Sequence, residues 1–139
     1  MAESVYCDIV SAEEKIFSGK VSMIVATATQ GQIGILPGHA PMLTGIEAGP
    51  IKVTTENGEE SYFASGGYLE VQPNRVTVLA DTALRAKDMD EAAAEEARKE
   101  AARALANKES DLDYTRAAAQ LAEATAQIRM IQNLRKKVR

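Results

Sequence analysis

The chain has 139 residues and a net charge of −4, with one cysteine and one histidine. A lone cysteine excludes an internal disulfide, and one cysteine with one histidine cannot supply a common zinc site. The sequence lacks the Gly-x-x-x-x-Gly-Lys-Ser/Thr phosphate loop, which excludes a self-contained P-loop nucleotidase at motif level. It starts without the charged and apolar regions of a signal peptide, and no apolar run is long enough to span a bilayer. We therefore expect a cytoplasmic protein whose link to a membrane comes through a partner.

Glycine and proline divide the chain into two parts. All nine glycines and all four prolines lie at or before Pro73, and residues 86–139 contain neither. Turn-formers and helix-breakers are absent over such a length only where the chain forms long helices. We predict an all-β sandwich domain at 1–85 and an α-helical hairpin of two antiparallel helices at 86–139.

Alternating apolar residues in the first part predict β-strands. Val5, Cys7 and Ile9 alternate with Tyr6 and Asp8, and Val21, Met23 and Val25 alternate with Ser22 and Ile24, both at the period of two expected of a strand. Further short runs lie at 51–55, 61–64, 68–71 and 75–80. Turns are predicted at Gly19, Gln30-Gly31, Pro37-Gly38, Gly49-Pro50, Asn57-Gly58, Gly66-Gly67 and 72–74. Asn57-Gly58 is the strongest of these, because both residues tolerate the positive φ of a two-residue hairpin. Many short strands without intervening helices indicate an antiparallel sandwich or barrel.

The second part carries two helical patterns joined by a polar segment at 107–111. Asp88 and Glu91 have the spacing of a capping box, so the first helix is expected to begin there and to end near Ala106. The two predicted seams repeat at intervals of three and four, and consist of Ala94, Ala97, Ala101 and Ala104 in the first helix and Tyr114, Ala117, Leu121, Ala124, Ile128, Ile131, Arg135 and Val138 in the second. Methyl groups bury little surface, about 0.8 kcal/mol each, so the hairpin should be only marginally stable. Its excess apolar surface must face the sandwich, another chain, or each in turn.

Charge is unevenly distributed. Residues 1–86 hold five Lys/Arg and ten Asp/Glu, whereas residues 87–139 hold eleven and ten. No acidic residue follows Glu123, although Arg129, Arg135, Lys136 and Lys137 do. We expect this basic end to bind anionic groups such as acidic protein surface, phosphate or lipid headgroups.

Catalytic readings of the remaining polar residues are weak. Cys7 and His39 could form a nucleophile and base, but the strand pattern around Cys7 favours a core position. His39 is expected to be exposed in a proline-bracketed loop, either as a partner contact or as an ordinary loop residue. Glu59-Glu60, beside a hairpin turn, are typical of a solvated face.

Several motifs in order resemble the epsilon subunit family of bacterial F-type ATP synthases. The most distinctive is the loop of residues 34–44, Gly-Ile-Leu-Pro-Gly-His-Ala-Pro-Met-Leu-Thr. The others are Val10-Ser11-Ala12-Glu13, Ile16-Phe17-Ser18-Gly19, Ser65-Gly66-Gly67-Tyr68-Leu69-Glu70-Val71, Val76-Thr77-Val78-Leu79-Ala80-Asp81 and Asp111-Leu112-Asp113-Tyr114. The resemblance runs essentially from end to end.

The resemblance implies a non-catalytic rotor subunit that binds the gamma subunit, rests on the membrane-embedded c-ring and helps couple proton flow to rotation. It would lie at the cytoplasmic face of the bacterial inner membrane, with no nucleic-acid partner and no membrane contact except through the c-ring. By position, Gln30, Gly31, Gln32 and Ile33 resemble the turn that faces the c-ring, although Gln32 stands where relatives often have an acid. Part of the gamma-facing surface would be Pro37, Gly38, His39, Ala40, Pro41, Met42 and Leu43.

The resemblance also implies that, as in bacterial members of the family, the C-terminal helices can extend along gamma into the catalytic head and block ATP hydrolysis. The resemblance assigns this inhibitory arm to Ile128, Arg129, Ile131, Leu134, Arg135, Lys136 and Lys137, which would meet gamma and the alpha and beta subunits. Two rival readings stay open: a β-sandwich adaptor with a permanently docked hairpin, and a small hydrolase using Cys7 and His39.

Some relatives bind ATP through an Ile/Leu-Asp-x-x-Arg-Ala motif. Here the matching residues are Met89, Asp90, Ala93 and Ala94, with alanine in place of the motif arginine, and Thr125 replaces a further arginine of the second helix. Losing these charge-assisted hydrogen bonds predicts weak or absent ATP binding, and no cofactor is expected.

Overall fold

The computed structural model describes residues 3–107 and 111–138, with the backbone alone for Asp111, Lys137 and Val138. It divides into two compact units, Met1–Lys87 and Asp88–Arg139. The strands of the first unit are β1 (Val5–Ser11), β2 (Lys15–Val21), β3 (Met23–Ala28), β4 (Gly31–Ile35), β5 (Met42–Ile46), β6 (Gly49–Thr55), β7 (Gly58–Ala64), β8 (Gly67–Gln72), β9 (Arg75–Ala80) and β10 (Ala83–Arg85). A 3₁₀ turn (Ala86–Asp88) precedes the helices α1 (Glu91–Ala106) and α2 (Asp111–Val138).

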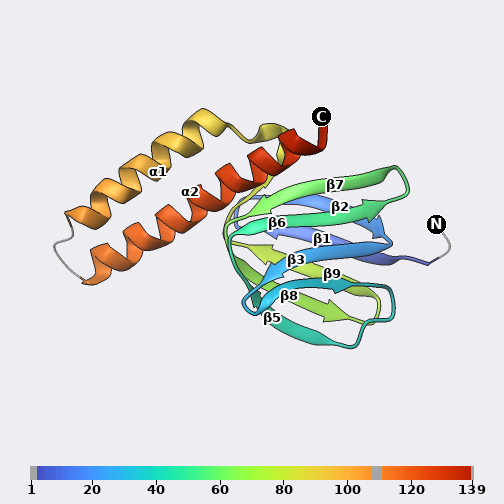
Figure 1. The fold of residues 1–139 in the computed structure, drawn as a ribbon. Helices are drawn as coiled ribbons and strands as arrows, with labels where there is room; N and C mark the ends of the chain where they lie inside the picture. Colours follow the sequence, from blue (N-terminus) through green and yellow to red (C-terminus); the bar gives the residue numbers. More distant parts are fainter. Residues whose placement is uncertain (1–2, 108–110, 139) are drawn as a thin grey trace. The chain divides into compact units, whose positions relative to one another are not determined.

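The strands form one hydrogen-bonded sheet that folds over into two layers (Figure 1). Their order is β10-β7-β6-β3-β5-β8-β9-β1-β2, with β4 paired to β3. β3 and β5 share a single pair, Ala28 with Ile46, so the sheet turns its corner there. β2 contacts both β6 and β10, which brings the two free edges of the sheet together. The predicted β-sandwich is therefore confirmed, in a form close to a closed barrel.

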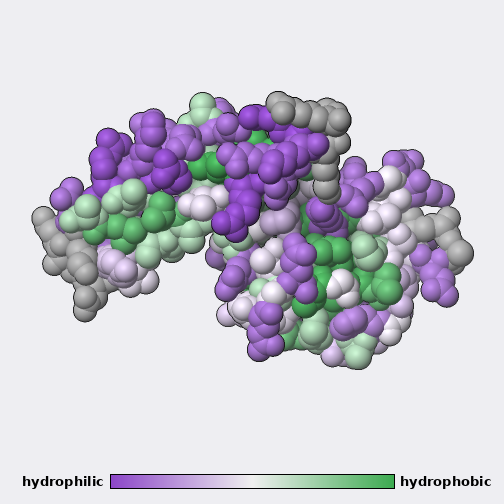
Figure 2. All heavy atoms as spheres, in the orientation of Figure 1, coloured by the Kyte–Doolittle hydropathy of each residue, from purple (hydrophilic) through white to green (hydrophobic). Residues whose placement is uncertain are grey.

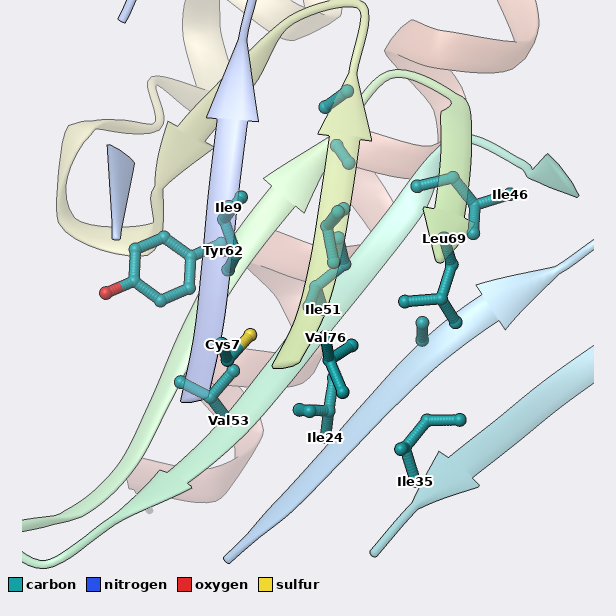
Figure 3. Close-up of a cluster of buried hydrophobic side chains, with 14 of the residues drawn as sticks. Cys7, Ile9, Ile24, Ile35, Ile46, Ile51, Val53, Tyr62, Leu69 and Val76 are labelled. Atoms are coloured by element: carbon teal, nitrogen blue, oxygen red, sulfur yellow. The ribbon is translucent and has the colours of Figure 1, made fainter. Parts of the chain in front are cut away.

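Side chains from both layers fill the core. Phe63, Ile9, Ile24, Ile35 and Leu69 are among its fully buried large residues. In Figure 3, Cys7 and Ile9 from β1 point toward the same interior as Ile51 and Val53 from β6. The prediction that Cys7 is a core residue is confirmed, because its exposed fraction is 0%.

One strand pair departs from the antiparallel expectation. β1 and β9 pair in parallel, in a register that joins Tyr6 to Arg75 and Ser11 to Ala80. Parallel neighbours need a long crossover instead of a hairpin, and here the intervening strands provide it. The prediction of a wholly antiparallel sheet was wrong at this pair.

The prediction for residues 21–25 was also wrong, both in treating them as one strand and in the residues that alternate toward the core. β2 ends at Val21 and β3 begins at Met23, so the chain turns at Ser22 instead of continuing as one strand. Ile24, Ala26 and Ala28 face the core, whereas Met23 is 37% exposed. Gly19, predicted as a turn, lies within β2.

The β6–β7 hairpin forms at the predicted turn, but its two-residue loop is Glu56-Asn57 and not Asn57-Gly58. Thr55 pairs with Gly58 across a two-residue loop, and Gly58 has φ of 119°. No described non-glycine residue has positive φ, so Asn57 does not use its tolerance for it. The Thr55 hydroxyl instead accepts a hydrogen bond from the Asn57 N–H at 3.2 Å and fixes the turn.

The two predicted helices are present, and α1 ends at Ala106 as expected. The cap differs: Asp90, with extended φ of −119°, accepts a hydrogen bond from the N–H of Ala93, whereas Asp88 belongs to the preceding 3₁₀ turn. The expected capping box beginning at Asp88 was therefore placed two residues too early. The polar segment between the helices falls mostly on residues 108–110, which lie outside the described residues.

The hairpin seam is narrower than predicted. Ala94 and Ala101 of α1 and Ala117, Ala124 and Ile128 of α2 are buried, at 3% to 9% exposed, and Met130, outside the predicted seam, is buried too. Ala97 and Ala104, which were expected in the same seam, are exposed. Tyr114 is also exposed, while Leu121 and Ile131 are half-buried. None of the described helices is long and apolar enough to cross a membrane.

Candidate functional site

The β3–β4 hairpin presents a polar tip. Ala28 pairs with Gly31 across the loop Thr29-Gln30, and Gly31 reaches φ of 123° with no atom near its missing side chain. The Thr29 N–H donates to the Gly45 carbonyl at 3.3 Å, which ties the tip to β5. Gln30, Gly31 and Gln32 are exposed, and Ile33 packs partly against the core. The tip therefore offers two amide side chains on a backbone that its neighbours hold in place.

The segment from Pro37 to Leu43 begins with a tight turn. The His39 N–H donates to the Leu36 carbonyl at 3.1 Å, with Pro37 first in the turn and Gly38 second at φ of 88°. This is the residue pattern of a type II turn. The His39 ring is half-buried and not exposed as expected, and its Nδ1 lies 2.7 Å from the Ala40 carbonyl. A carbonyl only accepts, so Nδ1 carries the proton in this contact.

Exposed apolar side chains gather on the outward face of β5, β8 and β9. Leu43 is 67% exposed, Tyr68 59% and Leu79 51%. Tyr68 pairs directly with Leu79, and Gly45, two residues after Leu43, pairs with Tyr68. Alternation along each strand therefore places all three on one face, called here the outer apolar face. Leu43 was a predicted site residue, whereas Tyr68 and Leu79 were missed although both are large apolar residues in the solvent phase of a predicted strand.

A cluster of polar and ionic contacts lies on the outward side of β1, β2 and β9. Asp8 is 6% exposed and accepts a 2.6 Å hydrogen bond from the Ser18 hydroxyl and another from Arg75. The Ser18 hydrogen bond holds the pKa of Asp8 below its ordinary value and Arg75 adds to this, although burial acts in the opposite direction. The Arg75 guanidinium and the Lys20 ammonium lie 5.4 and 5.9 Å from the centre of the Tyr6 ring. These contacts fix three strands beside one another.

The hydrolase reading of Cys7 conflicts with its surroundings. Burial, reinforced by the neighbouring Asp8 carboxylate, raises the pKa of the Cys7 thiol to about 12. Only the thiolate is a good nucleophile, so Cys7 is inert at neutral pH. No group of three or more His, Cys, Asp or Glu side chains in the described part of the chain could hold a metal ion.

The arm residues differ in burial. Ile128 is 9% exposed, Ile131 and Leu134 are half-buried, and Arg129, Arg135 and Lys136 are exposed. The Lys137 side chain lies outside the described residues. Arg135 donates a 2.6 Å hydrogen bond to Glu91, at the start of α1. This contact could not be found from periodicity alone, because it depends on the register between the two helices.

A groove of about 560 Å³ runs between α1 and α2. Six of its ten lining residues in the described part of the helices are alanines, and Figure 2 shows pale green, moderately hydrophobic surface on the helical unit beside purple charged side chains. Ala93 and Ala94 of the ATP-motif segment line it, together with the carboxylates Glu100 and Glu123. Asp90 is engaged in capping α1 and Met89 is half-buried. None of the described lining residues is a lysine or an arginine, so the groove repels a polyphosphate.

Comparison with known proteins gives consistent matches along the chain. Residues 4–86 match the family model described as ATP synthase, Delta/Epsilon chain, beta-sandwich domain, and residues 87–132 match the corresponding long alpha-helix domain. The chain is 62% identical over 135 residues to the ATP synthase epsilon chain of Chromohalobacter salexigens, covering 96% of each. It is 57% identical over 141 residues to that of Teredinibacter turnerae, covering 100% of each.

Two solved assemblies contain chains of similar fold. One is the mitochondrial ATP synthase of Euglena gracilis, in a structure of OSCP, F1 and c-ring, with a TM-score of 0.76 and 21% identity over 88% of this chain and 78% of the other. The second is the central stalk and c-ring of the Tetrahymena thermophila enzyme, with a TM-score of 0.64 and 12% identity over 93% and 97%.

Proposed function

The chain belongs to the ATP synthase delta/epsilon chain family, as a bacterial epsilon subunit, and we propose that it couples proton-driven rotation to ATP synthesis and restrains ATP hydrolysis. Epsilon chains are structural and regulatory, so the subunit is not the catalytic one. One of the similar chains belongs to an assembly of OSCP, F1 and c-ring, and the other to an assembly of central stalk and c-ring. The proposed location is the cytoplasmic face of the inner membrane, with membrane contact through the c-ring.

We propose two rotor contacts on the sandwich. The polar tip at Gln30–Ile33 would contact the c-ring. Gln30 and Gln32 would form hydrogen bonds there, because Gln32 replaces the acidic residue that relatives often have. The turn at Pro37–Leu43 would contact gamma, and the adjoining outer apolar face of Leu43, Tyr68 and Leu79 supports this assignment. Three neighbouring large side chains that are more than half exposed are typical of a docking surface.

The narrow alanine seam is the observation that carries the regulatory part of the proposal. The four buried alanine methyl groups contribute about 3 kcal/mol, and the buried side chains of Ile128 and Met130 add about 1.5 to 3 kcal/mol each. The cost of ordering the residues that connect the helices, about 1 to 2 kcal/mol for each, offsets much of this gain. A closed and an extended hairpin can then lie within a few kcal/mol of each other, as a reversible arm requires. In the extended state, Ile128, Ile131 and Leu134 would pack on gamma, and Arg129, Arg135, Lys136 and Lys137 would meet carboxylates of the alpha and beta subunits.

Truncation after Asn107 tests the inhibitory role. We expect the truncated subunit to assemble normally and the complex to hydrolyse ATP faster than the intact one. Co-purification with gamma and the c-ring serves as the assembly control. An unchanged hydrolysis rate in a fully assembled complex would reject the arm and favour a sandwich adaptor with a permanently docked hairpin.

A further inference from the structure

An ion pair joins the first turn of α1 to the last turns of α2. Nη2 of Arg135 lies 2.6 Å from Oε2 of Glu91, between residues 44 positions apart in the sequence. Both side chains are partly exposed, at 56% for Arg135 and 37% for Glu91. The pair can exist only while the two helices lie side by side, so it reports on the closed hairpin.

The charges of both helices favour this contact. The beginning of α1 is acidic, with Asp90 and Glu91 followed by Glu95 and Glu96, whereas no acid follows Glu123 in α2. An antiparallel hairpin places this acidic end beside the basic end of α2. The partial positive charge of the α1 N-terminus also favours Glu91, and the C-terminal end of α2 favours a cation.

The nearest competing cation in α1 is already engaged. Arg98 donates a 2.5 Å hydrogen bond to Glu95 of the same helix. Glu95 lies one turn after Glu91. Arg98 is therefore held away from Glu91, which Arg135 meets in the closed form. Four of the buried residues described in the two helices are alanines, whose methyl groups have no directional preference, and the others are Ile128 and Met130. A directional contact such as this ion pair is therefore well placed to help set the register between the helices.

We infer that the Glu91–Arg135 pair is a latch that holds the hairpin closed. The inference rests on the proposed function, in which the basic end of α2 binds carboxylates on the catalytic subunits. One guanidinium cannot pair with Glu91 and with a distant carboxylate at once, so closure and inhibition compete for Arg135. Release of Glu91 is then part of every inhibitory extension.

The first test uses the isolated full-length chain and hydrogen exchange of the α1 and α2 amides. Glu91→Gln removes the charge with little change in shape, and we expect seam amides to exchange about two- to fivefold faster, as loss of an exposed ion pair predicts. Raising salt should narrow the difference from wild type. The matched control is Glu96→Gln, an exposed acid in the same helix, which should exchange as wild type does.

A charge swap separates the pair from each residue's own effect. Glu91→Arg and Arg135→Glu should each open the hairpin. The double variant should exchange more slowly than the two single effects combined predict, although both helix ends now disfavour the swapped charges. Equal exchange in Glu91→Gln and Glu96→Gln, or a double variant that matches the combined single effects, would overturn the latch. Because this readout uses the isolated subunit, it is independent of whether truncation after Asn107 relieves inhibition in the assembled enzyme.

In the assembled enzyme, Glu91→Gln keeps the arm's own cations intact while releasing Arg135. We expect it to deepen the inhibition of ATP hydrolysis, and Glu96→Gln to leave the rate unchanged. One result would refute the competition for Arg135. Glu91→Gln would open the hairpin of the isolated subunit and leave the hydrolysis rate of the complex unchanged, although truncation after Asn107 raises that rate. Arg135 would then not be shared between the closed and the extended hairpin.

Discussion

Replacing Gly67 with alanine tests how tightly the sandwich is packed. The added methyl group has two separate costs, an unfavourable φ and a clash with the neighbouring strand. Gly67 begins β8 with φ of 137°, opposite Ala80 on β9. A β-carbon on it would lie 2.0 Å from the Leu79 carbonyl oxygen and 3.0 Å from the Ala80 Cα. Both neighbours are backbone atoms of a paired strand and cannot rotate away. Restoring ordinary contact would require β9 to move by roughly 1.4 Å in a close-packed sheet.

The expected loss for Gly67→Ala is about 4 kcal/mol. The unfavourable φ costs about 1 to 3 kcal/mol, and forced displacement of a packed backbone costs about as much again. A domain of this size is stable by only about 5 to 15 kcal/mol, so the variant should lose much of its stability. It should also shift Tyr68 and Leu79, because the β8–β9 register positions both on the outer apolar face.

Two other glycines provide matched controls. Gly31 has φ of 123° but no atom within 4 Å of an added β-carbon, so Gly31→Ala should show the φ cost alone. Gly34 has neither a positive φ nor a close neighbour, so Gly34→Ala should be neutral or slightly stabilising. Urea unfolding followed by circular dichroism measures all three. Equal losses for Gly67→Ala and Gly31→Ala would show that β9 yields without cost and would refute the clash.

Three further outcomes are expected. Asp8→Asn should cost about 2 kcal/mol at neutral pH by weakening charge-assisted hydrogen bonds, as urea unfolding would show. Because folding lowers the pKa of Asp8 below its ordinary 3.8, wild type should hold this advantage above that pH and lose it as pH falls through the folded pKa; a pH-independent difference would contradict the ion pair. Leu79→Ser should weaken binding to isolated gamma by about tenfold in a pull-down titration while leaving the unfolding midpoint nearly unchanged, and equal binding would remove the outer apolar face from the interface. Isothermal titration of ATP into the subunit should detect no binding below the millimolar range, because Ala93, Glu100 and Glu123 line the groove without a described cation; micromolar affinity would refute this.

The sequence predicted the sandwich correctly where local pattern decides the structure. Cys7 and Ile9 share a buried face because a strand has a period of two, and Gly58 takes positive φ because a hairpin must close there. The same rule failed at Met23, because the chain turns at Ser22 and β3 starts a new alternation in which Ile24, and not Met23, faces the core. Glycines within β4 and β5 hid those strands, since they lack the side chains on which the pattern depends.

Features that depend on distant pairing could not be read in this way. The parallel register of β1 with β9 is set by the whole sheet, and neither strand carries a local sign of it. Half of α1 is alanine, eight of sixteen residues, so its apolar periodicity points to several faces and does not single out Ala94 and Ala101. The Glu91–Arg135 contact depends on how the two helices align, and the periodicity within either helix does not predict that alignment.

The difference in side-chain size between the units explains why movement should be confined to one of them. The sandwich core is built from residues such as Ile9, Ile24 and Leu69, each worth about 1.5 to 3 kcal/mol on burial, so separating any one strand exposes several of them at once. The described helices bury four alanines, whose methyl groups are worth about 0.8 kcal/mol each, and only two larger side chains, Ile128 and Met130. Near such a balance, a change of 1.4 kcal/mol alters the ratio of closed to extended hairpin about tenfold. A single exposed ion pair is too weak to matter in the sandwich, yet it is large enough to bias the hairpin.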